Sequence, residues 1–297
     1  MSTRRLVVNA DDLGLAGSVN RGIIESIDRG VVTSTSLMVN MAATDDAISR
    51  LADWLSRTSS ADRATLSVGL HFNIVAGRPL ASCPTLLGAS GEFAGLAALA
   101  WRHFARRLGA DDVRRELEAQ LARAQRLLEP LGLRVTHIDS HRHAHSFPVV
   151  FDAVIQVARH HGIAHVRHPY ERHDVITRPG ARIAAHVLRA LAVNRKPLDD
   201  VGFAGVGAMG SLTFERDIGE LLAVLPAGTT ELMVHPGYDS PELAAIDPYR
   251  APRERELKAL TSPALRDRIL EQQVQLIPFA ATAPPAPAAT ARGSAAS

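Results

Sequence analysis

The feature that most constrains the fold of this chain is a repeated alternation of short apolar runs with longer segments of helical period. The first run, 6–8, precedes a segment in which Val19, Ile23 and Ile27 share one helical face. Further apolar runs predict strands at 31–39, 66–72, 135–139, 164–167 and 231–234. Repeated strand–helix units predict an α/β domain built on a parallel sheet, either open or closed into a barrel.

The segments between these runs predict helices with recognisable ends. Ser18 is expected to cap the first helix, and Gly30 is expected to stop it. Other helices are expected at 45–55, 148–160 and 214–224. Two more are expected after a Gly- and Pro-rich loop at 77–93. The stretch 171–211 shows little period. We predict one domain at 1–278, followed by a disordered tail rich in Ala, Pro, Thr and Ser at 279–297.

Composition and charge exclude several classes of protein. The formal net charge is only +2, and the arginines at 102–115 are expected to form the solvated side of a helix pair, so no nucleic-acid partner is expected. The single Cys83 excludes an intrachain disulfide. Asp11 and Asp12 end the first apolar run too early for a signal peptide, and no apolar stretch is long enough to span a membrane. We expect a soluble cytoplasmic protein that could form a homodimer.

Ionisable residues lie at the ends of the predicted strands. In chain order these are Asp11, Asp12, His71, Asp139, His141, His143, His145, Arg167 and His235. The carboxyl ends of parallel strands meet at one edge of a sheet or one mouth of a barrel. We therefore expect these side chains to gather in one functional site, which is an improbable outcome for ordinary surface groups.

The two adjacent aspartates are expected to do different work. Because neighbouring residues that leave a strand point in different directions, one of Asp11 and Asp12 can bind a cation while the other stays free as a base. The alternative is a turn or a helix-capping pair before Gly14. His71 stands in an apolar context, where a lone histidine is more often a core residue, so its interpretation depends on its partners.

The run "HIDSHRHAH" at 137–145 carries four histidines and an aspartate at alternating positions. An extended backbone would place all five side chains on one side, but they could not all bind one ion without a sharp bend. One or two ligands are expected here, with the remaining groups orienting those ligands or contacting a substrate. The alternative is a solvated polar loop.

A site of one carboxylate and two neutral imidazoles leaves coordination positions open for a water and a substrate oxygen. These ligands suit Zn²⁺ and also Fe²⁺, Mn²⁺ or Co²⁺. A metal-activated water and a free aspartate would make a hydrolase. A metallophosphoesterase, an iron oxygenase and a non-catalytic carbohydrate-binding protein are the rival hypotheses. The pair Asp11–Asp12 argues against the last, because a binding protein needs no free base.

Five motifs resemble the YdjC-like carbohydrate deacetylases, which include chitooligosaccharide deacetylases. They are "NADDLGL" at 9–15, "TSTSLMVN" at 33–40, "VGLHF" at 68–72, "THIDSHRHAHSFP" at 136–148 and "ELMVHPG" at 231–237. The motifs occur in order over about 6–238. The resemblance implies a distorted (β/α) barrel of the polysaccharide deacetylase type. It also implies removal of an N-acetyl group from a sugar by a metal-activated water, with Mg²⁺ or Zn²⁺ as the metal.

The resemblance also implies roles for single residues. Asp12, His71 and His141 resemble the metal ligands, and Asp11 resembles the general base. His235 is similar to the general acid of the wider superfamily, and Arg167 to an arginine that orients the base or steadies negative charge. The remaining candidates, expected to support the ligands or contact substrate, are Asp139, His143 and His145. Few aromatic residues are present, which favours a short chitooligosaccharide or a glycolipid-type substrate over a long glycan.

Overall fold

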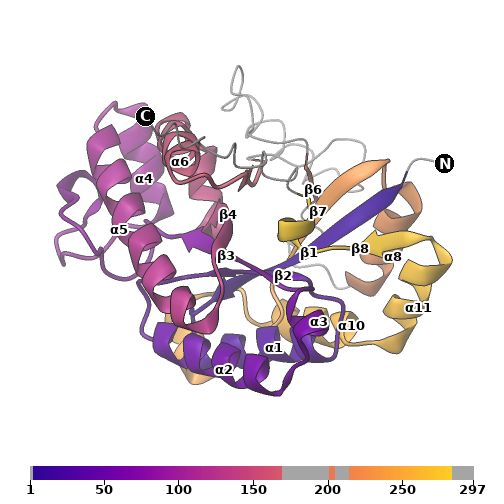
Figure 1. The fold of residues 1–297 in the computed structure, drawn as a ribbon. Helices are drawn as coiled ribbons and strands as arrows, with labels where there is room; N and C mark the ends of the chain where they lie inside the picture. The colour runs from indigo at the N-terminus through magenta and orange to yellow at the C-terminus, as the bar shows by residue number, and fades with distance from the viewer. Residues whose placement is uncertain (1–2, 169–200, 205–213, 283–297) are drawn as a thin grey trace, which may run out of the picture.

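Parallel β-strands form the centre of the molecule in the computed structural model, which describes residues 3–168, 201–204 and 214–282 (Figure 1). The strands form one sheet in the spatial order β5-β4-β3-β2-β1-β7-β6, and β8 pairs with β1 as well. Every pairing between them is parallel, and the sheet curls into a half-barrel. The bounds are β1 Arg4–Leu13, β2 Ser34–Leu37, β3 Ser67–Phe72, β4 Val135–Ser140, β5 His165–Val166, β6 Gly202–Ala204, β7 Gly228–Val234 and β8 Val274–Leu276. The expected barrel-type α/β fold is confirmed.

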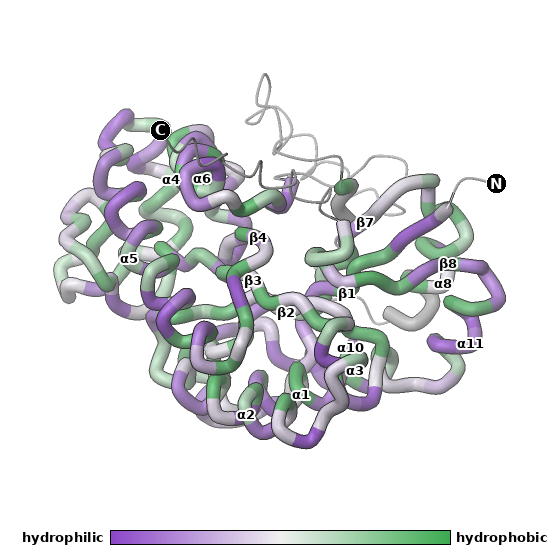
Figure 2. The backbone as a smooth tube through the Cα atoms, in the orientation of Figure 1, coloured by the Kyte–Doolittle hydropathy of each residue, from purple (hydrophilic) through white to green (hydrophobic). Residues whose placement is uncertain are grey.

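Helices cover the outside of this sheet (Figure 1). The α-helices are α1 Gly17–Asp28, α2 Thr44–Arg57, α3 Ser60–Arg63, α4 Leu96–Phe104, α5 Ala110–Leu128, α6 Pro148–His160, α8 Phe214–Val224, α9 Pro241–Ile246, α10 Ala251–Leu260 and α11 Pro263–Glu271. Short 3₁₀ helices are η1 Pro84–Leu86, η2 Glu129–Leu131, η3 His141–Ser146 and η4 Phe279–Ala281. Figure 2 shows hydrophobic and hydrophilic residues alternating along α2 and α5, as expected for helices with one buried face. Among the described helices, none has both the length and the apolar character needed to cross a membrane.

Strand β1 is buried on both of its faces, which explains the uninterrupted apolar run that starts the chain. Leu6, Val8 and Ala10 belong to the large core between the sheet and its helices. Val7 instead packs with Ile277 in a smaller apolar cluster. Because side chains alternate along a strand, Asn9 and Asp11 follow Val7 on the side away from the large core.

Two glycines allow close contacts that other residues would block. A Cβ atom on Gly69 in β3 would lie 2.4 Å from the ring of His137 in β4. A Cβ atom on Gly22 in α1 would lie 2.5 Å from the Cα atom of Gly237, just after β7. Both distances are far below van der Waals contact, so glycine at these positions brings β3 against a histidine ring and α1 against the loop after β7.

Some predicted element ends were wrong. Helix α1 begins at Gly17 after Ala16, and Ser18 lies inside its first turn, where its Oγ lies 3.0 Å from Ser240 Oγ. The helix ends at Asp28 with Arg29 as its C-cap, so Gly30 follows directly after the end, as expected. Side-chain partners elsewhere in the fold therefore overrode the local capping preference of Ser18.

The predicted tail also begins later than residue 279. Phe279 starts η4, is buried, and places its ring 4.2 Å from that of His137 and 5.3 Å from that of His165, centroid to centroid. The buried ring and the hydrogen bond from Ala280 N to Ser67 Oγ, at 2.9 Å, hold this turn against the sheet. Residues 283–297 and most of the stretch 171–211 lie outside the described residues.

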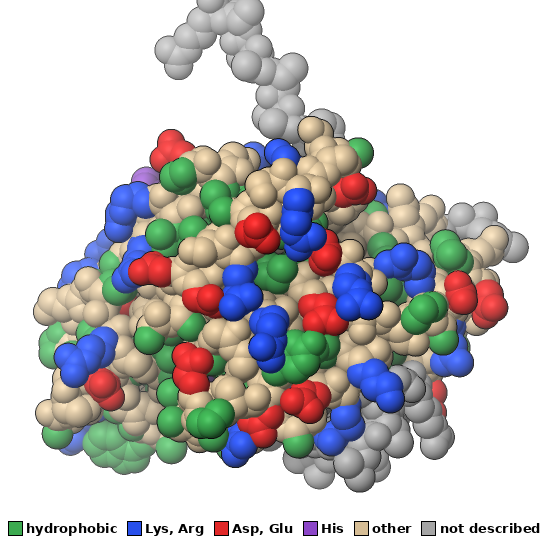
Figure 3. All heavy atoms as spheres, turned by 90° about the horizontal axis from the view of Figure 1, so that it is seen from below, with side chains coloured by type: hydrophobic (Ala, Val, Ile, Leu, Met, Phe, Trp, Pro, Cys, Tyr) green, Lys and Arg blue, Asp and Glu red, His purple; other side chains and the backbone are tan. Residues whose placement is uncertain are grey.

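The face seen from below carries basic and acidic side chains side by side (Figure 3). Helices α1 and α2 carry ion pairs of this kind, including Arg57 with Asp28 at 2.9 Å and Arg50 with Asp46 at 2.8 Å. Such mixed charge lowers the net electrostatic potential of this face.

Candidate metal centre

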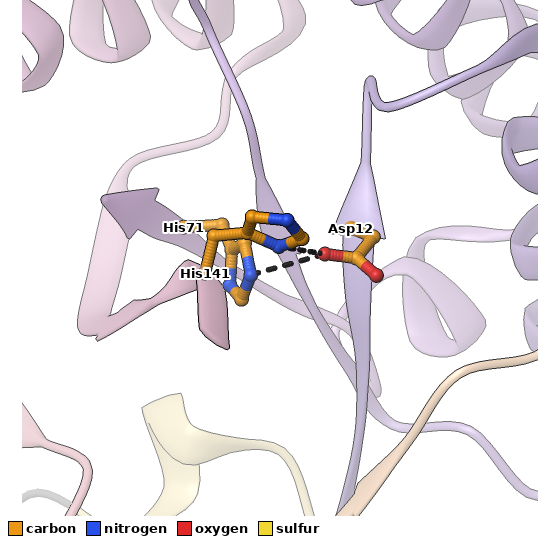
Figure 4. A group of neighbouring side chains, drawn as sticks. All are labelled: Asp12, His71 and His141. Atoms are coloured by element: carbon orange, nitrogen blue, oxygen red, sulfur yellow. Dashed lines mark hydrogen bonds and ion pairs between the residues drawn. The ribbon is translucent and has the colours of Figure 1, made fainter. Parts of the chain in front are cut away.

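Three predicted ligands converge on one point at the carboxyl ends of the strands. Asp12 Oδ1 lies 3.1 Å from His71 Nε2 and 2.8 Å from His141 Nδ1, and all three residues are buried (Figure 4). Asp12 comes from β1, His71 from β3, and His141 is the first residue after β4. One carboxylate oxygen and two imidazole nitrogens at these separations can hold a divalent cation.

Unusual backbone conformations deliver these ligands. Asp12 has φ +72°, in the left-handed region, and Gly14 follows with φ +102°. A Cβ atom on Gly14 would lie 2.4 Å from the carbonyl oxygen of Met38, so the turn after the aspartates requires glycine. Directly after His141, Arg142 and His143 also have positive φ, 52° and 53°. This bend breaks the strand alternation that the sequence suggested for 137–145.

A hydrogen bond on the far side of the ring orients His71. Its Nδ1 donates to Asp139 Oδ1 at 2.7 Å, which leaves Nε2 facing Asp12, where a bound cation would replace the proton on Nε2. Burial lowers the pKa of His71, but the carboxylates of Asp139, Asp12 and Asp11 outweigh it and raise that pKa to about 10. The negative charge that stabilises a protonated imidazole would equally stabilise a bound cation.

Asp11 lies beside this centre in an ion pair with Arg167. The guanidinium grips both carboxylate oxygens, Nη1 to Oδ2 and Nη2 to Oδ1, each at 2.6 Å. Asn9 Nδ2 donates to Asp11 Oδ1 at 2.8 Å. Burial raises the pKa of Asp11, but Arg167 lowers it more, so the carboxylate stays ionised well below neutral pH.

Arg167 also joins two further buried carboxylates to the site. Its Nη2 lies 2.7 Å from Asp139 Oδ2 and 2.6 Å from Glu231 Oε1. Asp11, His71 and Asp139 form a second group with metal-ligand spacing. Both oxygens of Asp11 and one oxygen of Asp139 are paired with Arg167, whereas Asp12 Oδ1 faces the two histidines, so the group around Asp12 is the better cation site.

His235 lies just after β7 on the same cavity. Its backbone N–H donates to Glu256 Oε2 at 2.6 Å, and its ring meets the ring of Tyr249 edge-on, with centroids 5.3 Å apart. Within the described part of the chain, its Nδ1 is buried and has no hydrogen-bond partner. The ring is therefore placed by packing and by its backbone anchor.

A cavity of about 280 Å³ opens onto these groups. It is lined by Asp11, Asp12, His71, His141 and His235, together with Leu96, Ser140, Arg142, His143, Met233, Asp247, Pro248, Tyr249 and Arg253. Ligand pockets usually range over roughly 300–1,000 Å³. The described cavity lies just below that range.

Some of the remaining predicted residues hold other side chains of the site, and others line the cavity. Asp139 contacts His71 and Arg167, as described above, and His143 lines the cavity. His145 is buried beneath it, with Nδ1 2.5 Å from Ser140 Oγ, and is not a lining residue. His137 lies 3.1 Å from Asn9 Oδ1 through Nε2, which gives it a structural position. Thus the run at 137–145 supplies one candidate ligand.

Several residues of the site were not predicted from the sequence. Arg253, Asp247, Tyr249 and Glu256 come from the chain at and before α10, where the charged pattern resembles that of a surface helix. Glu231 is a further buried carboxylate, and burial raises its pKa to about 7 against the opposing effect of Arg167. A signal for Glu231 was present, because a charge inside an apolar strand run needs a buried partner.

Comparison with known proteins identifies the family. The family model described as YdjC-like protein matches residues 5–271. A carbohydrate deacetylase of Geobacillus stearothermophilus is 38% identical over 278 residues, covering 93% of this chain and 97% of the relative. A human carbohydrate deacetylase is 34% identical over 300 residues, covering 92% of this chain and 89% of the relative.

A solved structure agrees in fold. It is a candidate cellobiose-phosphate cleavage protein of Enterococcus faecalis V583, with a TM-score of 0.74 at 23% identity, and the match covers 95% of this chain and 100% of that chain. The convergence of Asp12, His71 and His141 occurs within the motifs on which the sequence resemblance rested. By sequence and by fold, this chain belongs to the YdjC-like protein family.

Proposed function

We propose that the chain is a metal-dependent carbohydrate deacetylase that removes the acetyl group of an N-acetylated sugar by hydrolysis. The observation that carries this proposal is the Asp11 carboxylate, paired with Arg167, beside Asp12, His71 and His141 in one cavity. A metal-binding protein needs the last three residues but has no use for an additional carboxylate held ionised by an arginine. The relatives named carbohydrate deacetylase support the choice of substrate class.

Asp12, His71 and His141 would hold the cation through one oxygen and two nitrogens. Two imidazoles favour Zn²⁺, whereas Mg²⁺ prefers oxygen ligands. When bound, the cation polarises the acetyl carbonyl and lowers the pKa of water. The outer contact from Asp139 to His71 keeps the ligand ring in the tautomer that a cation requires.

The chain's own acid–base groups would move the protons. Asp11 accepts the proton of the attacking water, and Arg167 keeps its carboxylate ionised and correctly turned. The carbonyl carbon gains the C–O bond and then loses the C–N bond. His235 donates a proton to the departing nitrogen, so that the products are acetate and an amino sugar.

Acetate release is the direct test of this proposal. Purified protein, stripped with chelator and reloaded with Zn²⁺ or Mg²⁺, should release acetate from short N-acetylglucosamine oligomers or a glycolipid analogue. Asp11→Asn should retain the cation and lose turnover by roughly 10²–10⁴-fold, the usual contribution of a positioned base. Release of phosphate from a sugar phosphate without any acetate release would instead favour the metallophosphoesterase hypothesis.

A further inference from the structure

A buried arginine in α10 reaches the carboxylate of Asp12 from the side opposite the histidines. The side chain of Arg253 is only 1% exposed, and it donates from Nη2 to Asp12 Oδ2 at 2.7 Å. The same Nη2 donates to Asp247 Oδ2 at 2.7 Å, and Nε donates to the carbonyl oxygen of Tyr249 at 2.7 Å. These contacts fix the guanidinium between two carboxylates.

The two oxygens of Asp12 therefore face different partners. Oδ1 faces His71 and His141, whereas Oδ2 is held by Arg253. A carboxylate can bind a cation through one oxygen or through both. With Oδ2 engaged, only Oδ1 is available on the histidine side, which leaves more of a bound cation's coordination sphere open.

Asp247 is itself firmly placed, so the arrangement is a fixed triad. Its Oδ1 accepts the backbone N–H of Tyr249 at 3.0 Å, and its side chain is 6% exposed. The half-exposed Arg142 approaches the same oxygen more loosely, at 3.4 Å. The buried charges of Asp12, Arg253 and Asp247 add up to one negative charge next to the candidate cation site.

The remaining nitrogen of Arg253 shows that the carboxylates decide its orientation. Among the described residues, Nη1 is buried and has no hydrogen-bond partner. A buried donor without a partner is unfavourable and calls for an explanation. The other two nitrogens are held by Asp12, Asp247 and the carbonyl oxygen of Tyr249, so these three contacts set the orientation of the guanidinium.

We propose that Arg253 is a positioning residue that reserves Asp12 Oδ1 for the cation, and that Asp247 balances its charge so that the cation is held neither too tightly nor too weakly. The inference rests on the proposed metal site. It predicts opposite effects from the two members of the pair, which a merely structural role would not produce.

The test is cation titration of the full chain after chelator treatment, by calorimetry with Zn²⁺. Arg253→Gln removes a positive charge and frees a carboxylate oxygen, so affinity should rise by roughly tenfold. Asp247→Asn leaves the positive charge of Arg253 less compensated, so affinity should fall by roughly tenfold. The expected result is therefore a pair of shifts with opposite sign.

Two further readouts report on the same arrangement without turnover. Metal-free Arg253→Gln should melt at a lower temperature than the wild type, because two buried carboxylates lose their partner, and Zn²⁺ should raise its melting temperature by more than it does in the wild type. With Co²⁺, the visible absorption of this variant should weaken if the freed oxygen raises the coordination number.

The matched control is Arg250→Gln, which removes an exposed arginine paired with Asp239 at 2.7 Å close to α10. It should change none of these readouts. Zn²⁺ affinity that shifts in the same direction in Arg253→Gln and Asp247→Asn would overturn the inference. So would unchanged Zn²⁺ affinity in Asp247→Asn. Asp247→Asn carries this test alone if Arg253→Gln does not fold. A wild-type chain that binds neither Zn²⁺ nor Co²⁺ would overturn the proposed function and this inference together.

Discussion

Two parts of the chain build the site in different ways. The strand part consists of the ends of β1, β3 and β4 and supplies Asp12, His71 and His141. The C-terminal part, residues 247–256, supplies Arg253, which holds Asp12, and Glu256, which holds the backbone of His235. In the strand part, the parallel sheet itself brings the ligands together. In the C-terminal part, position depends on where a helix packs against the finished sheet.

Substitutions in the strand part are expected to impair cation binding more than substitutions in the C-terminal part. Each residue of the strand part offers an atom that nothing else in the described chain duplicates at that point. The C-terminal part shares its work among several hydrogen bonds, such as those that Glu256 accepts from Tyr249 and from the backbone of His235. We therefore expect all-or-none effects in the first part and graded effects in the second.

The largest effect is expected from His71→Ala. This change removes one imidazole ligand and the hydrogen bond to Asp139, so the protein should lose its cation and its turnover together. Metal analysis of the purified variant and acetate release at saturating substrate would measure both. Tight retention of one cation per chain in the variant would contradict the ligand assignment and break the contrast between the two parts.

A smaller effect is expected when the pH of the metal-free protein is raised. The folded-state pKa of His71, about 10, exceeds its ordinary value of 6.5, so its stabilising contribution is complete below pH 6.5 and declines as pH rises toward 10. Between pH 6.5 and 9, the free energy of unfolding should fall by an amount on the order of 3 kcal/mol.

Urea unfolding at a series of pH values would measure this decline. The interval ends at pH 9 because burial raises the pKa of Cys83 to about 12, from an ordinary value of 9, and the thiol would contribute above that pH. His71→Ala is the matched control and should lack the decline. An equal slope in that variant would assign the pH dependence to other groups.

The smallest effect is expected in the C-terminal part, from Tyr249→Phe. The substitution removes the hydroxyl that donates to Glu256 Oε1 at 2.5 Å and keeps the ring against His235. The free energy of unfolding should fall by about 0.5–1.5 kcal/mol, the usual net value of one hydrogen bond. Thermal unfolding and cation titration would measure the two quantities separately. The stability of Tyr249→Phe should fall, while its cation affinity should stay near that of the wild type.

The two parts also differ in how far sequence alone predicts them. The sequence alone predicts one site for Asp11, Asp12, His71 and Arg167. Each lies at the end of an apolar run, and a parallel sheet brings the carboxyl ends of its strands to the same edge. The bend that ends the strand alternation in 137–145 could not be predicted from the sequence. Arg142 and His143 have positive φ there, and neither residue type indicates such a backbone conformation.

Arg253 lay beyond sequence-based reasoning. A helix with the sequence "APRERELKAL" carries many charged residues. Its packing against α1 and α8 and the contact with Asp12 leave one of its arginines, Arg253, buried. The same holds for the first helix, whose start at Gly17 depends on contacts with a segment more than two hundred residues away. The intrinsic preference of a residue for a helix position is weak, so contacts with distant residues can override it.

The left-handed backbone at Asp12 restricts which ligand this position can offer. At φ +72°, bulky and β-branched residues are strained, whereas Asp and Asn adopt this region more readily. A carboxylate at the end of a longer side chain would therefore be disfavoured by the main chain before any question of reach arises. In a library of variants at residue 12, folded members should be enriched in Asn and Gly, while cation-binding members should be almost all Asp. The shape of the turn and the charge of the ligand thus select the same residue independently.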